Sequence, residues 1–362
     1  MFRLALRLVL ALFSIILLYV GIVLAHGTWS DYQPAAVLSA DASPAATTGE
    51  ITDSTLSLFI WNLGFGGLGA KSNFFYDNGD FFFANGRMVR SSESLVSAYN
   101  EGITQVLGQT KADFFLLQEV DYASKRSYYI NQFDNISRIK SDYAAAFAPN
   151  YKVSRVPIPV FEPWRAYGET NSGLATFSRF TPISSTRYQL PGDHPWPTRI
   201  FQLDRCVLWQ RYALANGKEL VIGNIHNSAY DKGGVLKAQQ MAFLKEKITS
   251  EYEKGNYVIL GGDWNQVPPY FQFDGFMPGK AGKFSQINIA PDFLDADWQW
   301  VYDPTVPTNR KTSEVYKSGE TFITLIDFYL LSPNLRAMTV KGINQNFAYS
   351  DHQPVYLEVA LR

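Results

Sequence analysis

The most constraining stretch of the chain runs Tyr257-Val258-Ile259-Leu260-Gly261-Gly262-Asp263-Trp264-Asn265. A short apolar run rich in β-branched residues predicts a buried strand, and paired glycines allow a tight turn or a close approach at its end. Asp263 and Asn265 would then stand where a rigid sheet can aim them into a cleft. The alternative is a strand followed by an ordinary Asx turn. The other strand ends decide between these two interpretations.

Polar residues stand at or beside the ends of apolar runs throughout the chain. The eight residues in such positions are Asn62, Glu119, His226, Asp263, Asn265, Asp327, Asp351 and His352. Burying an unpaired carboxylate is costly, so each acid needs a partner such as a metal ion, a histidine or a substrate. One such residue carries little weight, whereas eight at comparable positions predict a single polar cleft.

The remaining pattern predicts alternating strands and helices. Residues 91–108 have apolar side chains at helical spacing, with Ser91 or Ser92 as the cap, and a second helix is expected over about 235–252. Asn216-Gly217 lies between two strands and is the strongest short-range signal for a hairpin. Residues 121–164 receive no detailed assignment. The hairpin and the short connections favour a mixed sheet over a pure βαβ array.

Composition limits the class of protein. The chain has 362 residues, of which 46% are hydrophobic and 15% aromatic, and this excludes wholesale disorder. The formal net charge of −1 leaves no broad basic face for gripping long nucleic acid. A single cysteine, Cys206, excludes an internal disulfide and a cysteine-rich zinc site.

The N-terminus predicts a membrane anchor or uncleaved signal over residues 1–25. Arg3 and Arg7 precede an uncharged apolar run from 8 to 25, which is at the lower limit of about 18 residues for a spanning helix. A retained anchor is favoured over cleavage after Ala25, which would release a secreted protein. In both cases the basic flank stays cytoplasmic and the remainder is extracytoplasmic, periplasmic in a bacterium. Residues 26–50 are expected to form a flexible linker, and 51–362 one catalytic domain.

Seven short motifs occur in an order that is informative as a set: Trp61-Asn62, Leu117-Gln118-Glu119, Ser172-Gly173-Leu174 through Ser178-Arg179, Asn224-Ile225-His226, Gly262-Asp263-Trp264-Asn265, Ile326-Asp327 and Ser350-Asp351-His352. In this order they resemble the endonuclease/exonuclease/phosphatase superfamily, which includes DNase I, abasic-site endonucleases and sphingomyelinases. The resemblance covers about residues 56–361. It implies an α/β fold of the DNase I type, a four-layer sandwich of two mixed sheets flanked by helices.

The resemblance also implies a role for each of the eight residues. Glu119, Asn62 and Asp351 match the positions that hold Mg²⁺, with Mn²⁺ as the alternative, and oxygen ligands suit these ions. Asp263 matches the residue that orients and deprotonates the attacking water. The remaining four match phosphoryl-binding and supporting positions, with Asn265 and His226 on the phosphoryl group, His352 as its second imidazole partner, and Asp327 as the support of His352.

The expected function is therefore a Mg²⁺-dependent phosphoesterase that hydrolyses a phosphodiester by in-line attack of water. Candidate substrates are a phospholipid head group, a small phosphorylated molecule and nucleic acid. Abasic-site endonucleases usually have an acid where this chain has Gly64, and Asn227 replaces a common leucine, so DNA repair and nucleic acid in general are not favoured. Alternatives are an extracytoplasmic nuclease and a catalytically silent binding protein. The N-terminal helix implies a membrane partner, and no obligate protein partner is evident.

Overall fold

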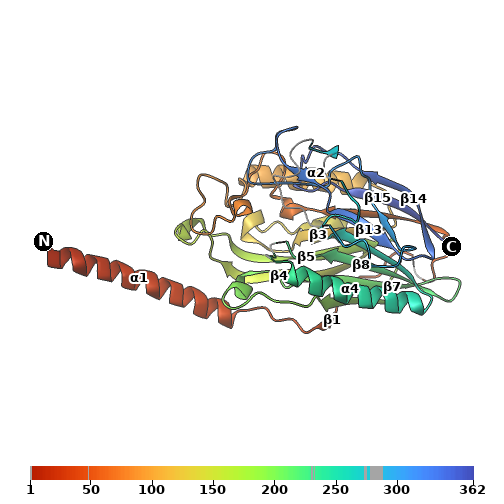
Figure 1. Ribbon diagram of the computed structural model, residues 1–362, viewed down its shortest axis with the longest axis horizontal. Helices are drawn as coiled ribbons and strands as arrows, with labels where there is room; N and C mark the ends of the chain where they lie inside the picture. The colour runs from red at the N-terminus through yellow and green to blue at the C-terminus, as the bar shows by residue number, and fades with distance from the viewer. Residues whose placement is uncertain (1, 48, 230, 232, 273–274, 278–287) are drawn as a thin grey trace.

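Two β-sheets packed face to face form the body of the protein, as the computed structural model shows for residues 2–47, 49–229, 231, 233–272, 275–277 and 288–362 (Figure 1). The seven-stranded sheet has the order β1-β6-β7-β8-β9-β13-β10, and the six-stranded sheet the order β14-β15-β2-β3-β5-β4. The strands of the first sheet are β1 Val37–Ser39, β6 Ser184–Gln189, β7 Cys206–Ala213, β8 Glu219–His226, β9 Tyr257–Asp263, β13 Asp327–Leu331 and β10 Gln299–Val301. Those of the second are β14 Leu335–Gly342, β15 Val355–Leu361, β2 Thr55–Asn62, β3 Phe114–Asp121, β5 Gly168–Ser178 and β4 Ala144–Val156. A separate pair consists of β11 Asn309–Arg310 and β12 Ile323–Thr324.

Helices cover both outer faces of the sandwich. Four α-helices occur in the described residues, α1 Phe2–Trp29, α2 Glu93–Gln109, α3 Gln132–Ile139 and α4 Val235–Glu253. Short 3-10 helices are η1 Gly64–Gly66, η2 Phe75–Asn78, η3 Lys125–Ser127, η4 Pro163–Arg165 and η5 Thr198–Phe201. Hydrophobic side chains of α2 and α3 pack on the six-stranded sheet, and those of α4 pack on the seven-stranded sheet.

Side-chain alternation along the central strands explains why four layers form. In β2, Leu58 and Ile60 pack between the two sheets, whereas Phe59 and Trp61 pack under α2. Successive residues of a strand point to opposite faces, so each central strand contributes to two cores. The layers are helix, sheet, sheet and helix, which confirms the predicted DNase I-like sandwich.

The strand register gathers the polar strand ends at one edge. β2 and β3 are parallel with Asn62 opposite Gln118, and β8 and β9 are parallel with His226 opposite Asp263. β13 runs antiparallel to β9, which places its first residue, Asp327, opposite Asp263. Residues from both sheets therefore meet at this edge, although they are far apart in the sequence.

Most predicted elements of the body are present. Ser92 caps α2 by accepting a hydrogen bond from the backbone of Leu95, and Gly217, with a φ of 75°, lies in the turn of the predicted hairpin. The unassigned segment 121–164 contains α3 and the thirteen-residue strand β4. Strand β5 extends beyond the end of β3, because its residues 168–171 pair with β4 alone.

The prediction of a flexible linker at 26–50 is wrong for the described residues up to 47. α1 continues to Trp29, and β1 pairs with β6 so that Val37 lies opposite Tyr188. Beyond β1 the chain donates further backbone hydrogen bonds, including one from Ser43 to the carbonyl oxygen of Ala145. Backbone pairing holds this segment together with the packing of small side chains, such as Ala40 in a cluster with Leu174 and Leu208. Composition alone therefore did not reveal the contact.

Candidate active site

A cavity of about 820 Å³ opens where the strand ends meet. Six of the eight predicted site residues line it, namely Glu119, His226, Asp263, Asn265, Asp351 and His352. Asn62 and Asp327 are buried behind this lining and contact it through hydrogen bonds. The structure thus brings the whole predicted set together.

Asp263 lies at the centre of the set. Its carboxylate accepts hydrogen bonds from Asn62 Nδ2 at 3.0 Å and from the backbone nitrogen of Asn265 at 2.8 Å. The Nε2 atoms of His226 and His352 are 3.5 and 3.7 Å from Asp263 Oδ2. Burial raises the pKa of Asp263 to about 6, although the charge of His352 acts in the opposite direction. Asp263 is therefore a carboxylate near neutral pH that can still accept a proton.

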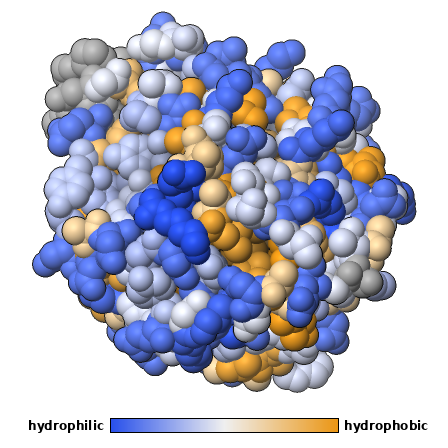
Figure 2. Space-filling view, turned by 90° about the vertical axis from the view of Figure 1, so that its right-hand side faces the viewer, coloured by the Kyte–Doolittle hydropathy of each residue, from blue (hydrophilic) through white to orange (hydrophobic). Residues whose placement is uncertain are grey.

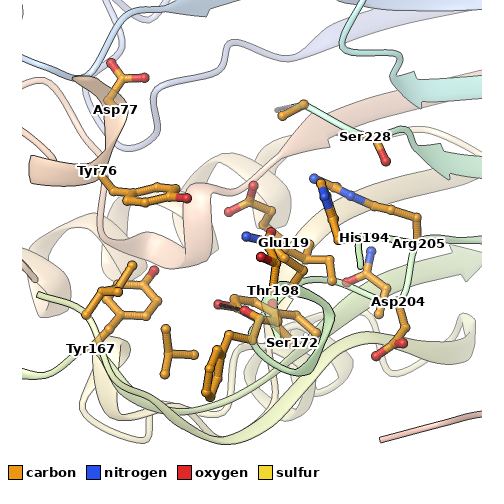
Figure 3. Close-up of a pocket in the computed structure, with 18 of the residues that line it drawn as sticks. Tyr76, Asp77, Glu119, Tyr167, Ser172, His194, Thr198, Asp204, Arg205 and Ser228 are labelled. Atoms are coloured by element: carbon orange, nitrogen blue, oxygen red, sulfur yellow. Dashed lines mark hydrogen bonds between the residues drawn. The ribbon is translucent and has the colours of Figure 1, made fainter. Parts of the chain in front are cut away.

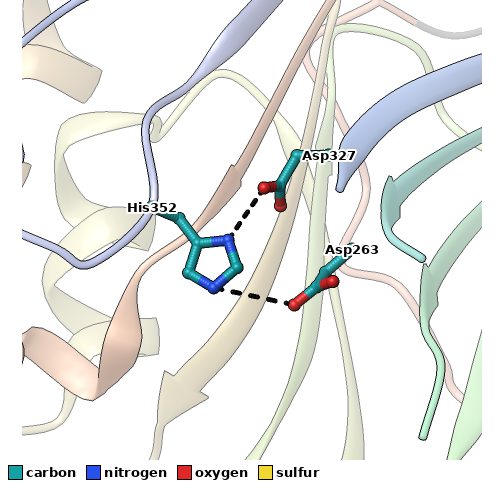
Figure 4. Close-up of side chains that lie close together, drawn as sticks. All are labelled: Asp263, Asp327 and His352. Atoms are coloured by element: carbon teal, nitrogen blue, oxygen red, sulfur yellow. Dashed lines mark hydrogen bonds and ion pairs between the residues drawn. The ribbon is translucent and has the colours of Figure 1, made fainter. Parts of the chain in front are cut away.

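His352 is held by Asp327 on the side away from Asp263 (Figure 4). Its Nδ1 atom is 2.8 Å from Asp327 Oδ2, and Trp61 donates its indole N–H to the backbone oxygen of the same histidine. Burial acts to lower the pKa of His352, but the carboxylates of Asp327 and Asp263 outweigh it and raise the pKa to about 10. The imidazole is therefore positively charged, with its Nε2–H facing the cavity.

The pKa of His226 is shifted in the opposite direction to that of His352. Burial, together with the nearby charge of Arg205, lowers its pKa well below the usual value. A neutral imidazole carries one N–H, and here Nε2 faces Asp263 and also Glu119 Oε1, the latter at 3.9 Å. The two histidines of the site therefore offer one neutral and one charged donor.

Glu119 points into the cavity from an irregular backbone (Figure 3). The pairing of β3 with β5 shifts register between Leu117 and Val120, and Glu119 adopts a φ of 50°. A left-handed conformation is rare for a residue with a side chain, and such strain concentrates at functional sites. The bulge turns the carboxylate into the cavity instead of the core.

Asp351 faces the same region of the cavity as Glu119. Burial raises the pKa of Asp351 to about 7, and the negative charge of Glu119 adds to the rise although His352 opposes it. An added Cβ on Gly64 would lie 2.5 Å from Asp351 Oδ1 and would also be strained by a φ of 49°. Glycine at this position therefore makes room for Asp351, so the acid that abasic-site endonucleases place here would not fit.

A sequence model of the Endonuclease/Exonuclease/phosphatase family matches residues 60–352. The chain belongs to this family. The matched segment begins in β2 and ends at His352, so it includes all eight site residues. None of the curated proteins matches the chain by sequence.

Solved structures with the same fold agree with this membership. A family protein from Bacteroides vulgatus is 14% identical with a TM-score of 0.52, and the match covers 86% of this chain and all of that one. One from Beutenbergia cavernae is 15% identical with a TM-score of 0.50, covering 85% and 72%. TDP2 from Caenorhabditis elegans is 12% identical with a TM-score of 0.51, covering 87% and 77%. At these identities the likeness concerns the fold alone.

Two amides of the site make hydrogen bonds within the protein. Asn62 accepts from the backbone nitrogen of Gly64 and donates to Asp263. These contacts hold Asp263, and the oxygen of Asn62 keeps a second lone pair, so its metal-binding role stays a prediction. Asn265 donates from Nδ2 to the backbone oxygen of Asn227 at 2.9 Å, which leaves one of its two amide hydrogens for a ligand.

Sequence reasoning missed Asn309 and Arg126. Asn309 lies 2.9 Å from His352 Nε2, and an imidazolium in that position requires the amide oxygen to face it. No apolar run precedes this asparagine, so no strand-end signal could reveal it. Arg126 forms a buried ion pair with Asp121 and stacks on the ring of Phe65, 3.9 Å from its centroid. Its spacing of five residues from an acid at the end of β3 was the available signal.

Proposed function

We propose that this family member is a metal-dependent phosphoesterase that hydrolyses a phosphodiester with a water molecule as nucleophile. The observation that carries the proposal is the position of His226, whose Nε2 atom lies 3.5 Å from Asp263 and 3.9 Å from Glu119. His226 therefore links Asp263, which is suited to activate water, to Glu119, whose carboxylate is suited to bind a cation. The two residues come from different sheets, so the arrangement depends on the whole fold.

Glu119 and Asp351 fit a divalent cation. Both carboxylates face the cavity, and the raised pKa of Asp351 reflects a buried negative charge that lacks a sufficient counter-charge. Hard oxygen ligands suit Mg²⁺ and also Mn²⁺. When bound there, the ion would neutralise charge on the phosphoryl group.

Asp263, Asp327 and His352 also place ligand atoms within 4.8 Å of one another. This cluster is a poorer cation site, because the charged imidazole of His352 already lies between the two carboxylates. A second positive charge would be repelled by the first. We therefore assign these three residues to acid–base chemistry.

The side chains of the cavity support an in-line displacement. Asp263 holds the attacking water and accepts its proton as the new bond to phosphorus forms and the bond to the leaving oxygen breaks. His226 and His352 donate Nε2–H hydrogen bonds to phosphoryl oxygens as negative charge builds. Asp327 keeps His352 protonated, and Asn62 keeps Asp263 in position.

We further propose that the enzyme is membrane-anchored through α1 with its catalytic body outside the cytoplasm. α1 is long and apolar enough to cross a membrane, and a signal sequence satisfies the same test. Arg3 and Arg7 precede the apolar run, which favours a cytoplasmic N-terminus.

A substrate panel tests the proposed activity. The purified full-length protein would be assayed in Mg²⁺, and again in EDTA, against bis-p-nitrophenyl phosphate, sphingomyelin and plasmid DNA. We expect Mg²⁺-dependent hydrolysis of the phosphodiester dye, and a fall in kcat of at least about 100-fold in both Asp263→Asn and Glu119→Gln. Glu93→Gln, an exposed acid at the start of α2, is the matched control and should behave as wild type.

Two outcomes of the substrate panel would contradict the proposed activity. Undetectable turnover of every substrate by the wild-type protein would overturn the enzymatic proposal and favour a binding protein on the same fold. Rapid cutting of DNA without hydrolysis of the lipid would identify a nuclease instead.

A further inference from the structure

Five exposed aromatic side chains form a ridge on the surface. This aromatic ridge consists of Phe81, Phe82, Phe83 and Phe161, whose rings contact one another, and of Trp164, which follows Phe161 by three residues in the same loop. Phe82 is 54% exposed and Trp164 is 74% exposed, so the rings are not part of a core. Contiguous exposed apolar side chains on a folded protein mark an interaction surface, whereas single ones carry no such meaning.

The ridge is held in shape by the backbone beneath it. Val160 and Phe161 donate backbone hydrogen bonds to the carbonyl oxygens of Phe81 and Phe82, at 3.1 and 3.0 Å. The ring of Phe161 stacks on Phe82 with centroids 5.4 Å apart and contacts Phe83 at 5.3 Å. Two loops distant in sequence therefore present their rings together, and little ordering is needed on binding.

The ridge and α1 lie at the same end of the protein (Figure 1). The orange loop that carries residues 81–83 and the yellow-green loop near η4 project from the left end of the body, the side on which α1 leaves it. Both elements also line the catalytic cavity, the ridge through Phe81 and Phe82 and the helix through residues 19, 20, 23 and 24.

The length of α1 places this end of the body at a bilayer surface. Its 28 residues rise about 42 Å at 1.5 Å each, whereas a hydrocarbon core is about 30 Å thick and needs about 20 residues. The uncharged run 8–25 fills the hydrocarbon core, so the last turn of the helix, from His26, emerges at the interface. The residues that border the cavity, 19, 20, 23 and 24, lie in the part of the run next to this interface.

Contacts at the end of α1 fix the orientation of the body. Gly27 lies against the side chains of Ile200 and Phe201 of η5, and Trp196 donates its indole N–H to Thr28. Ser30 is hydrogen-bonded to Ser154 of β4. The body is therefore held against the end of α1 by these contacts and is not connected to it by a flexible linker alone.

We propose that the aromatic ridge inserts into the interface of the bilayer that α1 spans, so that the catalytic cavity opens at the lipid surface. Aromatic rings are favoured at the boundary between head groups and acyl chains. For the activity this implies a phosphoester carried by a membrane lipid, and that part of the inference rests on the proposed function. The insertion of the aromatic ridge into the bilayer does not depend on the proposed function.

Figure 2 shows the opposite end of the body, where hydrophilic residues surround a hydrophobic patch that runs from the centre of the view towards its lower edge. Met338 of β14, whose label lies at that end in Figure 1, is 51% exposed and provides an apolar control position of similar exposure to Phe82.

Site-specific probes test the insertion in the full-length protein. Cys206 is the only cysteine of the sequence, and it is buried, so a thiol-reactive NBD dye will label an added cysteine selectively. Phe82→Cys, Phe161→Cys and Met338→Cys would each be labelled and reconstituted in phosphatidylcholine vesicles. We expect blue-shifted emission, and at least twofold quenching by lipids brominated on their acyl chains, at both ridge positions but not at position 338.

Water-like emission at both ridge positions, equal to that of the control, would overturn the proposal and leave the ridge as a surface for a protein partner. Two ridge positions are used because a dye at one of them can disturb its own site. The result does not require any enzymatic turnover.

Enzyme kinetics test separately whether the substrate is a membrane lipid. Phe83 and Trp164 belong to the ridge but do not line the cavity. In the double variant Phe83→Ser/Trp164→Ser we expect at least tenfold slower hydrolysis of a phosphodiester lipid in vesicles, with hydrolysis of bis-p-nitrophenyl phosphate unchanged within twofold. Equal rates on the vesicle substrate would refute the lipid assignment. Absence of turnover on both substrates in the wild type would instead refute the proposed function.

Discussion

Asp263 and His352 place opposite charges 3.7 Å apart in a buried site. Each group keeps its charge because of a particular neighbour. Asp327 raises the pKa of His352 against the effect of burial, and hydrogen bonds from Asn62 and Asn265 limit the rise in the pKa of Asp263. The pH range of the proposed catalysis should therefore depend on Asp327 and Asn62, which are buried behind the cavity lining, and on the backbone of Asn265.

The pH–rate profile follows from these two groups. Asp263 must be ionised and His352 protonated, so kcat/KM for bis-p-nitrophenyl phosphate should rise through about pH 6 and fall through about pH 10. In Asp327→Asn the group that raises the pKa of His352 is lost, so the alkaline limb should move down by at least about one pH unit. Asp292→Asn, an exposed acid, should leave the profile unchanged. An unshifted alkaline limb in Asp327→Asn would contradict the assignment of His352.

Arg126 and Asp121 form a second buried ion pair, behind Glu119. This pair has a structural role, whereas the pair of Asp263 and His352 is assigned to acid–base chemistry. Arg126 donates to both carboxylate oxygens of Asp121 and to the hydroxyl of Tyr167, and both charged groups are almost fully buried. Burial acts to lower the pKa of Arg126, but Asp121 and the other neighbouring groups raise it well above the usual value. Removing one partner would leave the other charge buried and unpaired.

Asp121→Asn should therefore reduce the free energy of unfolding by about 3–5 kcal/mol. The matched comparison is Asp53→Asn, which breaks the exposed ion pair with Arg179 and should cost at most about 1 kcal/mol. Chemical denaturation of both variants in detergent solution measures the difference. Equal losses in the two variants would show that burial does not control the strength of the Asp121 pair.

At the scale of elements, strand ends were the predictable part of the site. Runs such as 114–117 and 257–260 are continuous apolar strands, and the acid that follows each run within three residues, Glu119 or Asp263, lines the cavity because an unpaired carboxylate is costly in the core. The same reasoning could not find Asn309, which follows no such run. It also did not reveal β4, where polar residues such as Lys152 interrupt any continuous apolar run.

Local sequence did not indicate that residues 37–47 contact the sheets, because most of the contacts that hold them are backbone hydrogen bonds. The pairing of β1 depends on β6, which is formed by residues about 150 positions later in the chain. Pairing of this kind is a property of the assembled sheet, whereas apolar runs are a property of the local segment.

Glu251 connects the end of α4 to the β7–β8 hairpin. It forms paired hydrogen bonds with Arg211 and accepts another from Asn256. Burial acts to raise the pKa of Glu251, but these hydrogen bonds and one from Lys254 lower it to about 2. A depressed pKa means that the contribution to stability is present above the ordinary value of 4.5 and is lost as the pH falls towards 2.

In Glu251→Gln we expect lower stability at pH 7 and a smaller loss of stability between pH 5 and about pH 2 than in the wild type. Glu253→Gln, an exposed acid two residues further along α4, serves as the control and should follow the wild type. Thermal unfolding monitored by circular dichroism across this range measures the effect. Parallel pH curves for Glu251→Gln and the wild type would be inconsistent with the lowered pKa.

At the scale of the whole molecule, the proposed cation should stabilise the fold. Glu119 comes from one sheet and Asp351 from the segment before β15, and a cation bound to both relieves the repulsion between them. Binding only to the folded state adds about 2.7 kcal/mol at a hundredfold excess over Kd. We expect Mg²⁺ to raise Tm by several °C and EDTA to reverse the rise.

Glu119→Gln should show little or no rise in Tm with Mg²⁺, whereas Glu93→Gln should keep it in full. Differential scanning fluorimetry in detergent measures all three proteins without reference to any substrate. A rise of equal size in Glu119→Gln would place the cation elsewhere.

Each sheet contributes one parallel strand pair to the site, β2 with β3 from one and β8 with β9 from the other. The first pair delivers Glu119, the proposed metal ligand, and the second delivers His226 and Asp263, the proposed activator of water. Apolar side chains between the sheets, such as Ile60 and Ile259, set the offset of one pair relative to the other together with the cross-sheet hydrogen bonds from Asn62 to Asp263 and from Gln118 to Asn224. The distance between the proposed metal site and the proposed water site is therefore a property of the interface between the sheets, and a core substitution that shifts one sheet by a fraction of an ångström would change turnover without touching a polar residue.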